Sequence, residues 1–493
     1  MINRLQPSVT ERLRLPINRG LYYGGSWHEP EDGVYVETRS PASGESLGET
    51  AWADSVDVDH AVEAAREGFR VWRETTPVAR GALLREAARL VRQHAEELAL
   101  LDAADCGNPI REMIKDAEIG ATALEYFAGL ATEVKGYTVP LGPDHLNFTI
   151  REPLGVIARI NAYNHPFMFA VSRAGAPLAA GNALIIKSPE QAPLSSLRLA
   201  ELIGPLFPPG VFNVVSGGRT CGEALVAHPH IAKVGLIGSV PTGKAILRGA
   251  VDSMKKVTLE LGGKNALIAY PDADPDKVAV GAVRGMNFSW CGQSCGSTSR
   301  VFLHDSIHDA VLDAIVKQVK AFVPGIPTDP ATTMGSLVSE AQFNKVMRFI
   351  TLGQSEGARL VTGGNSADDP HLGNGYFIKP TVFADVTPAM RLAREEIFGP
   401  VLSVFKWSDE VEMLRAVNDV DYGLTASIWT HDINKALRTA TQVEAGYIWI
   451  NGSGKHFVGT PFGGCKQSGL GREESIEELL DCTQLKNVNI SLE

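Results

Sequence analysis

The cysteine at position 295 has the surroundings of a nucleophile. It lies in the segment WCGQSCGSTSR, between Gly292 and Gly296, and small hydroxyl residues follow it. Small residues leave room for a substrate and bring backbone N–H groups close, where they can stabilise an oxyanion. A thiolate is a strong nucleophile once its pKa is lowered. Taken alone, the segment is equally consistent with a buried structural cysteine.

Two further polar residues suit such chemistry. Glu260 ends an apolar run just before two glycines, and burial there would raise its carboxyl pKa toward that of a general base. Asn164 follows the run LGVIARI, and its amide could donate to an oxyanion. The alternatives are a Glu260 that pairs with Lys264, and an asparagine that caps the next helix or turns the chain before Pro166.

Several segments could bind a nucleotide. Lys187 and Glu190 follow the run ALIIK, where a carboxylate can hold ribose hydroxyls, although the two could also form a solvated ion pair. Glycines at a strand-to-helix turn expose helix N–H groups to an anionic group, and the candidates are Gly218, Gly222, Gly238 and Gly243. Glu396, in REEIFGPV, would by itself pass for a charge on a solvated face.

The elements that must position these residues are short apolar runs separated by helix-length segments. We expect strands at 154–160, 183–187, 212–218, 233–239 and 256–263. Such runs are typical of buried parallel strands in a doubly wound sheet, which binds ligands at the carboxyl ends of its strands. A second series begins after Asn265 and predicts a second α/β domain in tandem. Segments 145–153 and 485–493 read as strands outside both sheets, which indicates an appendage that pairs with another subunit.

The composition excludes other classes of protein. The chain has 493 residues, 44% of them hydrophobic and 21% charged, with a net charge of −11. An acidic chain is a poor partner for nucleic acids and anionic membranes. No stretch reaches the roughly 18 apolar residues of a membrane span, and residues 1–16 lack the apolar core of a signal peptide. The six scattered cysteines predict a reducing, cytoplasmic setting, and without nearby histidines they predict no metal site.

Together these segments resemble the aldehyde dehydrogenase superfamily from about residue 20 to the end of the chain. YNHP, KSPEQ, GSVPTG, LELGGK, GQSC, EEIFGP and PFGGCKQSGLGRE occur in the family's order. The resemblance implies that Cys295, as a thiolate, attacks an aldehyde and that Glu260 activates the water that releases the acid. It implies that Asn164 and the Cys295 N–H hold the oxyanion. It overturns the structural alternatives for all three residues.

The resemblance also implies NAD as cofactor. A carboxylate at Glu190 would repel a 2′-phosphate, so NAD is favoured over NADP. The implied cofactor-binding residues are Ile160, Asn161, Lys187, Glu190, Gly218, Gly222, Gly238, Ser239, Thr242, Gly243, Leu261, Glu396 and Phe398.

A three-part subunit is implied as well. The NAD-binding domain would take 1–134 and 154–261, the catalytic domain 262–453, and the oligomerisation extension 135–153 and 476–493. Residues 454–475 would return to the active site. Family members are usually dimers or tetramers, so we expect a homo-oligomer.

The predicted substrate pocket comprises His165, Phe169, Ser172 and Ser294. His165 and Ser172 stand where many relatives are aromatic, which suits a polar or aromatic aldehyde better than a long alkyl one. His165 would hydrogen-bond a substrate hydroxyl or carboxylate, or else face water at a helix start.

Two other functions remain open on sequence grounds. Coenzyme A could take the acyl group instead of water, although Glu260 argues against this, or the chain could be a silent structural relative. Trp290 and Cys291 depart from the family's usual polar residue before the nucleophile. Cys291 could form a regulatory disulfide with Cys295 or be a bystander thiol.

Overall fold

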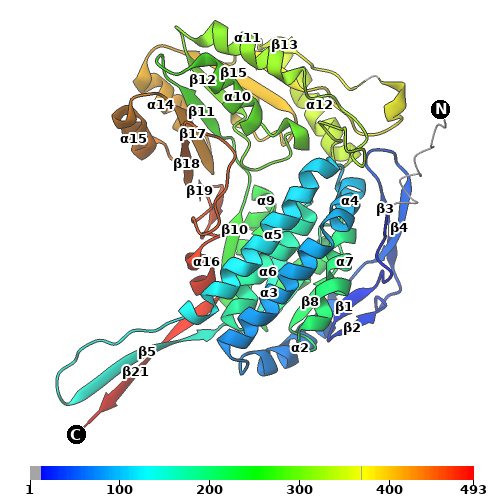
Figure 1. Cartoon of the computed structure of the whole chain (residues 1–493), viewed down its shortest axis with the longest axis vertical. Coiled ribbons are helices and arrows are strands. Elements are labelled where there is room, and N and C mark those ends of the chain that lie inside the picture. The colour runs from blue at the N-terminus through cyan, green and yellow to red at the C-terminus, as the bar shows by residue number, and fades with distance from the viewer. Residues whose placement is uncertain (1–12, 368, 493) are drawn as a thin grey trace.

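The computed structural model describes residues 13–367 and 369–492. The sequence predicts no signal peptide in residues 1–16, and residues 1–12 of that segment lie outside the described part of the chain. Two α/β units lie one above the other, and a two-stranded hairpin projects from the lower one (Figure 1). The α/β class with two parallel-sheet units is therefore confirmed. Within the described residues, no helix combines the length and apolar character needed to cross a membrane.

The first sheet has eight strands: β1 (Leu21–Tyr23), β2 (Ser26–His28), β6 (Val156–Ile160), β7 (Ala183–Lys187), β8 (Phe212–Val215), β9 (Ile231–Ile237), β10 (Lys256–Glu260) and β20 (Gly469–Leu470). Their order is β2-β1-β8-β7-β6-β9-β10-β20, and the five from β8 to β10 run parallel. The chain starts in the middle with β6, winds outward to β8, then returns to β9 on the other side. This doubly wound order places a topological switch point between β6 and β9.

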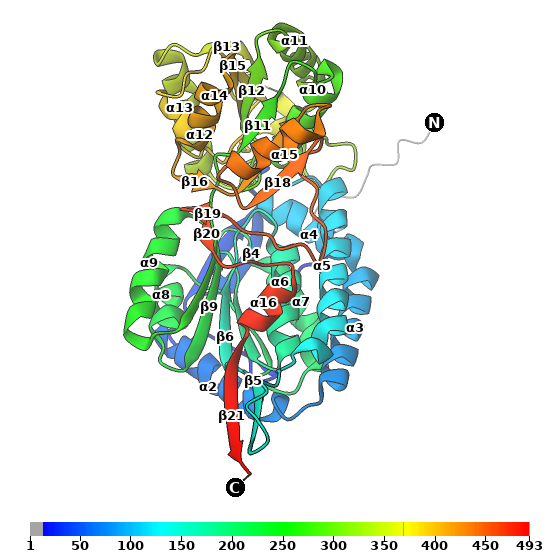
Figure 2. The same cartoon turned by 90° about the vertical axis from the view of Figure 1, so that its left-hand side faces the viewer.

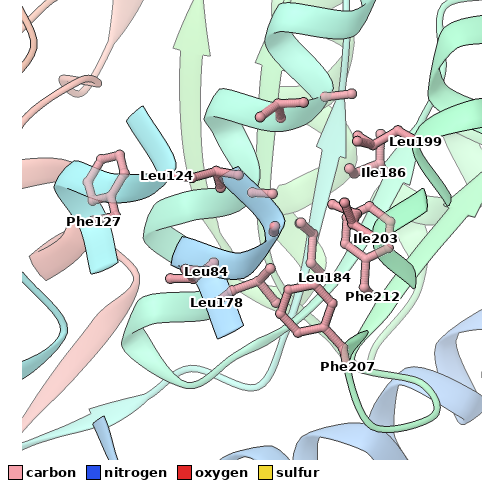
Figure 3. Packing of buried hydrophobic residues seen from close by; sticks show 14 of the residues in the cluster. Leu84, Leu124, Phe127, Leu178, Leu184, Ile186, Leu199, Ile203, Phe207 and Phe212 are labelled. Carbon is pink, nitrogen blue, oxygen red and sulfur yellow. The ribbon is translucent and has the colours of Figure 1, made fainter. Parts of the chain in front are cut away.

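Helices cover both faces of this sheet (Figure 2). One face carries α2 (Ser55–Trp72), α8 (Arg219–Ala227) and α9 (Val240–Ala250). The other face carries α3 (Pro77–Gln93), α4 (Ala95–Cys106), α5 (Ile110–Leu130), α6 (Pro166–Ala180) and α7 (Leu194–Ile203). Figure 3 shows Leu84 of α3, Leu124 of α5 and Leu178 of α6 near Ile186 and Phe212 of the sheet. Burial on both faces explains why these strands are continuous apolar runs.

The second sheet has seven strands: β11 (Ala266–Ala269), β12 (Arg300–His304), β13 (Arg359–Thr362), β14 (Thr381–Ala384), β15 (Val401–Trp407), β17 (Thr425–Trp429) and β18 (Tyr447–Ile450). Their order is β13-β14-β15-β12-β11-β17-β18, and only the edge strand β13 runs antiparallel. Its helices are α10 (Pro275–Gly285), α11 (His308–Val319), α12 (Glu340–Ser355), α13 (Arg391–Arg394), α14 (Glu410–Asn418) and α15 (Ile433–Gln442). The expected second α/β series is thus present.

Smaller elements complete the described chain. Paired short strands are β3 (Tyr35–Arg39) with β4 (Ser46–Ala51), and β16 (Tyr422–Gly423) with β19 (Cys465–Lys466). The 3₁₀ helices are η1 (Ala131–Glu133), η2 (Gly204–Leu206), η3 (Val251–Ser253), η4 (Phe288–Trp290) and η5 (Pro370–Leu372). The two strands expected outside the sheets are β5 (His145–Pro153) and β21 (Thr483–Ser491), which pair antiparallel with each other. They form the projecting hairpin, and α16 (Ile476–Asp481) leads into β21 (Figure 2).

The segment after β18 returns to join the two units. Within it, β19 pairs with β16 of the upper unit, while β20 pairs antiparallel with β10 of the lower unit. Glu473 and Glu478 then contact Arg159 of β6 and Arg173 of α6 in a buried ion network. The returning segment therefore packs against the carboxyl end of β10, where Glu260 lies.

Candidate active site

The candidate cofactor residues lie together because they follow the carboxyl ends of adjacent parallel strands. Ile160 ends β6, Lys187 ends β7, and Leu261 directly follows β10. Gly218 is the N-cap of α8 after β8, and Ser239 is the N-cap of α9 after β9. Gly222, Thr242 and Gly243 lie in the first turns of those two helices, and Gly238 directly follows β9. This edge is where a doubly wound sheet binds its ligand.

Polar groups at this edge are only partly bonded to other protein groups. The Nδ2 of Asn161 is buried and has no hydrogen-bond partner among the described residues. Lys187 is buried, which lowers the pKa of its amine, and its Nζ donates to the Ser188 carbonyl at 3.2 Å. Glu190 is exposed and accepts a hydrogen bond from Gln191, and it forms no ion pair with Lys187. The solvated Lys187–Glu190 pair that the sequence left open is absent.

Glu396 and Phe398 approach the same edge from the upper unit. The Glu396 carboxyl accepts a hydrogen bond from the Gly263 N–H at 2.9 Å, and burial raises its pKa. A Cβ at Gly262 would lie 2.2 Å from Glu396 Oε2, so only glycine allows this approach. Phe398 has a left-handed φ of 55°, and its ring meets Tyr163 edge-on at 6.0 Å. Glu396 is therefore no solvated surface charge.

Cys295 lies in a loop that is held by several specific bonds. Gly292 has a φ of 65°, and a Cβ there would lie 2.3 Å from the Gly399 carbonyl oxygen, so glycine is required. Asn265 Nδ2 donates to the Cys295 carbonyl at 2.7 Å and to the Ser297 carbonyl at 3.0 Å. Cys291 is a free buried thiol whose Sγ donates to the Gly335 carbonyl at 2.9 Å. The bystander interpretation of Cys291 therefore fits the geometry better than a disulfide.

The side chains of Cys295 and Glu260 meet. Glu260 is the last residue of β10 and is buried, its carboxyl adjoins the Cys295 thiol, and its Oε1 has no hydrogen-bond partner among the described residues. Burial raises the pKa of Glu260 to about 8. Burial, together with the charge of Glu260, raises the pKa of the Cys295 thiol. The expected thiolate is thus disfavoured in this state, because an anion would lie in a dry site beside a carboxyl group.

Two structural alternatives for these residues do not hold. Lys264 does not pair with Glu260, because its Nζ is buried without a hydrogen-bond partner in the described chain. Asn164 does not cap α6, whose N-cap is His165, although it does lie in the turn before Pro166. Asn164 is buried, and its carbonyl accepts a 2.6 Å hydrogen bond from Asn108 Nδ2, which fixes the loop after β6.

One cavity of about 1020 Å³ brings the candidate catalytic and substrate residues together. Asn164, Glu260 and Cys295 line it, and so do the four residues predicted for the substrate pocket: His165, Phe169, Ser172 and Ser294. The candidate cofactor residues lie outside its lining. His165 is buried rather than facing water, and its Nδ1 donates to Asp116 at 2.7 Å. Among the described residues, no cluster of three or more His, Cys, Asp or Glu could hold a metal ion.

Sequence reasoning did not anticipate Asn108, Asn265 and Asp116. Each contacts a site residue that lies far along the chain, at separations of 56, 30 and 49 residues. No sequence motif around any of the three residues predicts which distant residue it contacts.

A doubly wound sheet joined to a second α/β unit, with a thiol in the cavity between them, is typical of dinucleotide-dependent oxidoreductases. The family model described as the aldehyde dehydrogenase family matches residues 27–488, and the chain belongs to that family. It is 54% identical over 494 residues to aldehyde dehydrogenase tropH of Talaromyces stipitatus, covering 99% of this chain and 95% of that protein.

Solved structures are similar over nearly the whole chain. An NAD⁺ complex of aldehyde dehydrogenase from Bacillus cereus has a TM-score of 0.95 and 38% identity, with 99% of both chains covered. The indole-3-acetaldehyde dehydrogenase AldA of P. syringae, a cysteine-to-alanine mutant in complex with NAD⁺ and IAA, has a TM-score of 0.95 and 36% identity. That comparison covers 98% of both chains.

Proposed function

We propose that this protein oxidises an aldehyde to the carboxylic acid, with NAD as the hydride acceptor and Cys295 as the nucleophile. The observation that supports this most directly is the shared cavity of Cys295, Glu260 and Asn164, in which the carboxyl of Glu260 adjoins the Cys295 thiol. The same combination of nucleophile, carboxylate and amide serves acyl chemistry that passes through an oxyanion.

The Cys295 thiol releases its proton to solvent, and its sulfur attacks the aldehyde carbon to form a thiohemiacetal whose oxygen carries the negative charge. Ionisation of the thiol is easier while Glu260 is neutral, because a second negative charge in a buried site is costly. Charge then grows on the former aldehyde oxygen, where the Asn164 amide and the Cys295 N–H donate. Loss of one such donor typically costs ~10²–10³ in rate.

Oxidation converts the thiohemiacetal into a thioester on Cys295, and an oxidised nicotinamide supplies the hydride acceptor for this step. Glu260 then releases its own proton to solvent and takes a proton from a water molecule, which attacks the thioester; the Cys295 thiolate leaves and the acid is released. A Glu260 pKa of about 8 leaves both forms of the carboxyl accessible near neutral pH. One residue can therefore be neutral for attack and charged for hydrolysis.

The residues at the strand ends fit a dinucleotide. The unpartnered Asn161 Nδ2 and the exposed N-terminal turn of α9 with Ser239 lie at the switch point of the sheet. Glu190 would hold the hydroxyls of the adenosine ribose, and Glu396 those of the nicotinamide ribose. The charge of Glu190 favours NAD over NADP. We assign 1–134 and 154–261 to this NAD-binding domain and 262–453 to the catalytic domain.

The protein is further proposed to work as a homodimer or homotetramer in the cytoplasm. The exposed apolar face of the β5–β21 hairpin supports self-association through 135–153 and 476–493. All six cysteines are free, which supports a reducing compartment. Residues 454–475, which pair with both units, complete the wall behind the active site.

Replacement of the nucleophile tests the proposal. Cys295→Ala should abolish NADH formation from an aldehyde panel, followed by absorbance, and leave NAD binding intact, followed by protein fluorescence. Cys465→Ala is the matched control, because Cys465 is also a half-buried free thiol and should keep the wild-type rate. NADH formation by Cys295→Ala would refute the assignment. An acyl-coenzyme A product, or a rate that depends on coenzyme A, would refute the hydrolytic branch.

A further inference from the structure

The cavity wall carries a buried histidine–carboxylate pair that the proposed chemistry does not use. His165 Nδ1 donates to Asp116 Oδ2 at 2.7 Å, and both side chains are almost fully buried. The imidazole ring also meets Trp290 edge-on at 4.5 Å and Phe169 at 5.7 Å. These contacts fix the ring in the wall, and Nε2 has no partner among the residues that the structure describes.

The carboxylates around His165 favour the protonated, positively charged form of its ring. Burial alone would lower its pKa, but the adjacent Asp116 charge, together with Asp102 and Glu112, outweighs burial and raises the pKa. An imidazolium donates from both ring nitrogens. Since Nδ1 is bonded to Asp116, the Nε2–H remains available to an acceptor on a substrate.

The cavity as a whole has a surplus of positive charge. Its acidic residues other than Glu260 are each paired: Glu112 with Lys115, Asp116 with His165, Glu118 with Arg92, and Glu474 with Arg173. Arg284 and Lys455 also line the cavity and are exposed, and neither has an acidic partner within 13–367 and 369–492. Glu260 is largely neutral at pH 7 because its pKa is raised to about 8. The surplus favours an anionic substrate.

Aromatic side chains form much of the remaining wall, beside aliphatic ones such as Met168 and Val283. The aromatic side chains include Tyr126, Phe127, Phe169, Phe288, Trp290 and Trp449. Flat apolar walls suit a planar ring, which can stack against them or meet them edge-on. The cavity thus offers flat apolar walls for a planar ring and hydrogen-bond donors for an anion.

We propose that the substrate is an aromatic aldehyde that carries a second, acidic group on its ring, and that His165, held by Asp116, is the residue that selects for that group. This inference rests on the proposed aldehyde oxidation. Arg284 and Lys455, which are exposed and line the same cavity, add attraction for the same charge. A neutral aldehyde offers no charged acceptor to the Nε2–H of His165, so it forgoes this hydrogen bond.

The test compares benzaldehyde with 3- and 4-carboxybenzaldehyde, by kcat/KM for NADH formation. The wild type should prefer at least one of the acids by about tenfold to hundredfold, the range of a hydrogen bond to a charged group. His165→Phe, which keeps an aromatic ring in the wall, should raise KM for the acids more than for benzaldehyde, so that the ratio of kcat/KM between acid and benzaldehyde falls toward one. Asp116→Asn, a milder change, should reduce the preference in the same direction.

His94→Phe is the matched control, because His94 forms a similar pair with Glu97 at 3.0 Å and lies outside the cavity lining. It should keep the wild-type preference. Equal use of benzaldehyde and both acids by the wild type would overturn the inference. An equal loss on all three substrates in His165→Phe and Asp116→Asn would also overturn it, by showing a structural role. A protein that forms no NADH from any aldehyde would instead refute the proposed function itself.

Discussion

At the scale of single residues, the active site depends on one carboxyl group that serves two steps with opposite needs. Glu260 must be neutral for the adjacent thiol of Cys295 to ionise easily and charged to activate water. Burial makes both forms of the carboxyl accessible, because it raises the pKa of Glu260 to about 8. An exposed glutamate would be ionised throughout and would oppose the first step.

Glu260→Gln should separate the two steps. Glutamine keeps the volume and removes the charge, so sulfur attack and oxidation should proceed, but thioester hydrolysis should slow by about 10²–10⁴. Rapid mixing with NAD and aldehyde should therefore show a stoichiometric NADH burst followed by little turnover. Wild-type steady-state turnover in this variant would mean that another base works.

The pH dependence should report the same group. Glu260 must lose its proton to act as a base, and its raised pKa means that the active form accumulates only as pH rises. We expect the hydrolysis-limited rate to increase through about pH 8 and then level off. Steady-state rates between pH 6 and pH 9.5 test this, with Glu260→Gln as the control that should lack the inflection. A wild-type rate that is flat from pH 7 to pH 9 would contradict the assignment.

At the scale of elements, a buried ion network anchors the returning segment. Arg159 of β6 bonds Glu473 at 2.7 Å and also contacts Glu478, and all three side chains are at most 2% exposed. Arg159→Leu should lower the free energy of unfolding by about 3–5 kcal/mol, because two buried carboxylates lose their main cation. Urea unfolding measures this.

The control for that prediction is a surface pair. Arg219 and Glu223 lie 2.7 Å apart, but their side chains are 88% and 59% exposed. Arg219→Leu should therefore change stability by no more than about 1 kcal/mol. Similar losses in the two variants would show that burial is not what gives the network its strength.

Sequence patterns predict some elements far better than others. The strands from β6 to β10 were predictable because burial on both faces requires continuous apolar runs. The two-residue strands β19 and β20 were not, because their pairing is set by neighbours distant in the chain. Likewise, Cys295, Glu260 and Asn164 stand out by type and setting. Asn108, which fixes the Asn164 loop across 56 residues, does not.

At the scale of the whole molecule, the β5–β21 hairpin leaves one apolar face uncovered. Leu146, Ile150 and Ile490 are 46%, 40% and 38% exposed, and Leu146 lies opposite Ile490. Leu146→Glu with Ile490→Lys should convert the proposed oligomer to monomers, because charges replace the apolar contact. The opposite charges face each other, so the hairpin itself should persist. Light scattering after size-exclusion chromatography measures the mass, and an unchanged oligomer would place the interface elsewhere.

The pairing of β20 with β10 has a consequence for biosynthesis. The Ser468 hydroxyl donates a hydrogen bond to the Gly262 carbonyl, and the two residues are 206 positions apart in the chain. The edge of β10 beside Glu260 therefore stays unpaired while the ribosome translates the second unit. At about 5–20 residues per second, that interval lasts roughly 10–40 s. Throughout it, β10 is an open template for wrong pairing, and nascent chains would need protection by chaperones. A product that ends before residue 468 would lack both β20 and the Ser468 bond, so the edge of β10 next to Glu260 would stay unpaired.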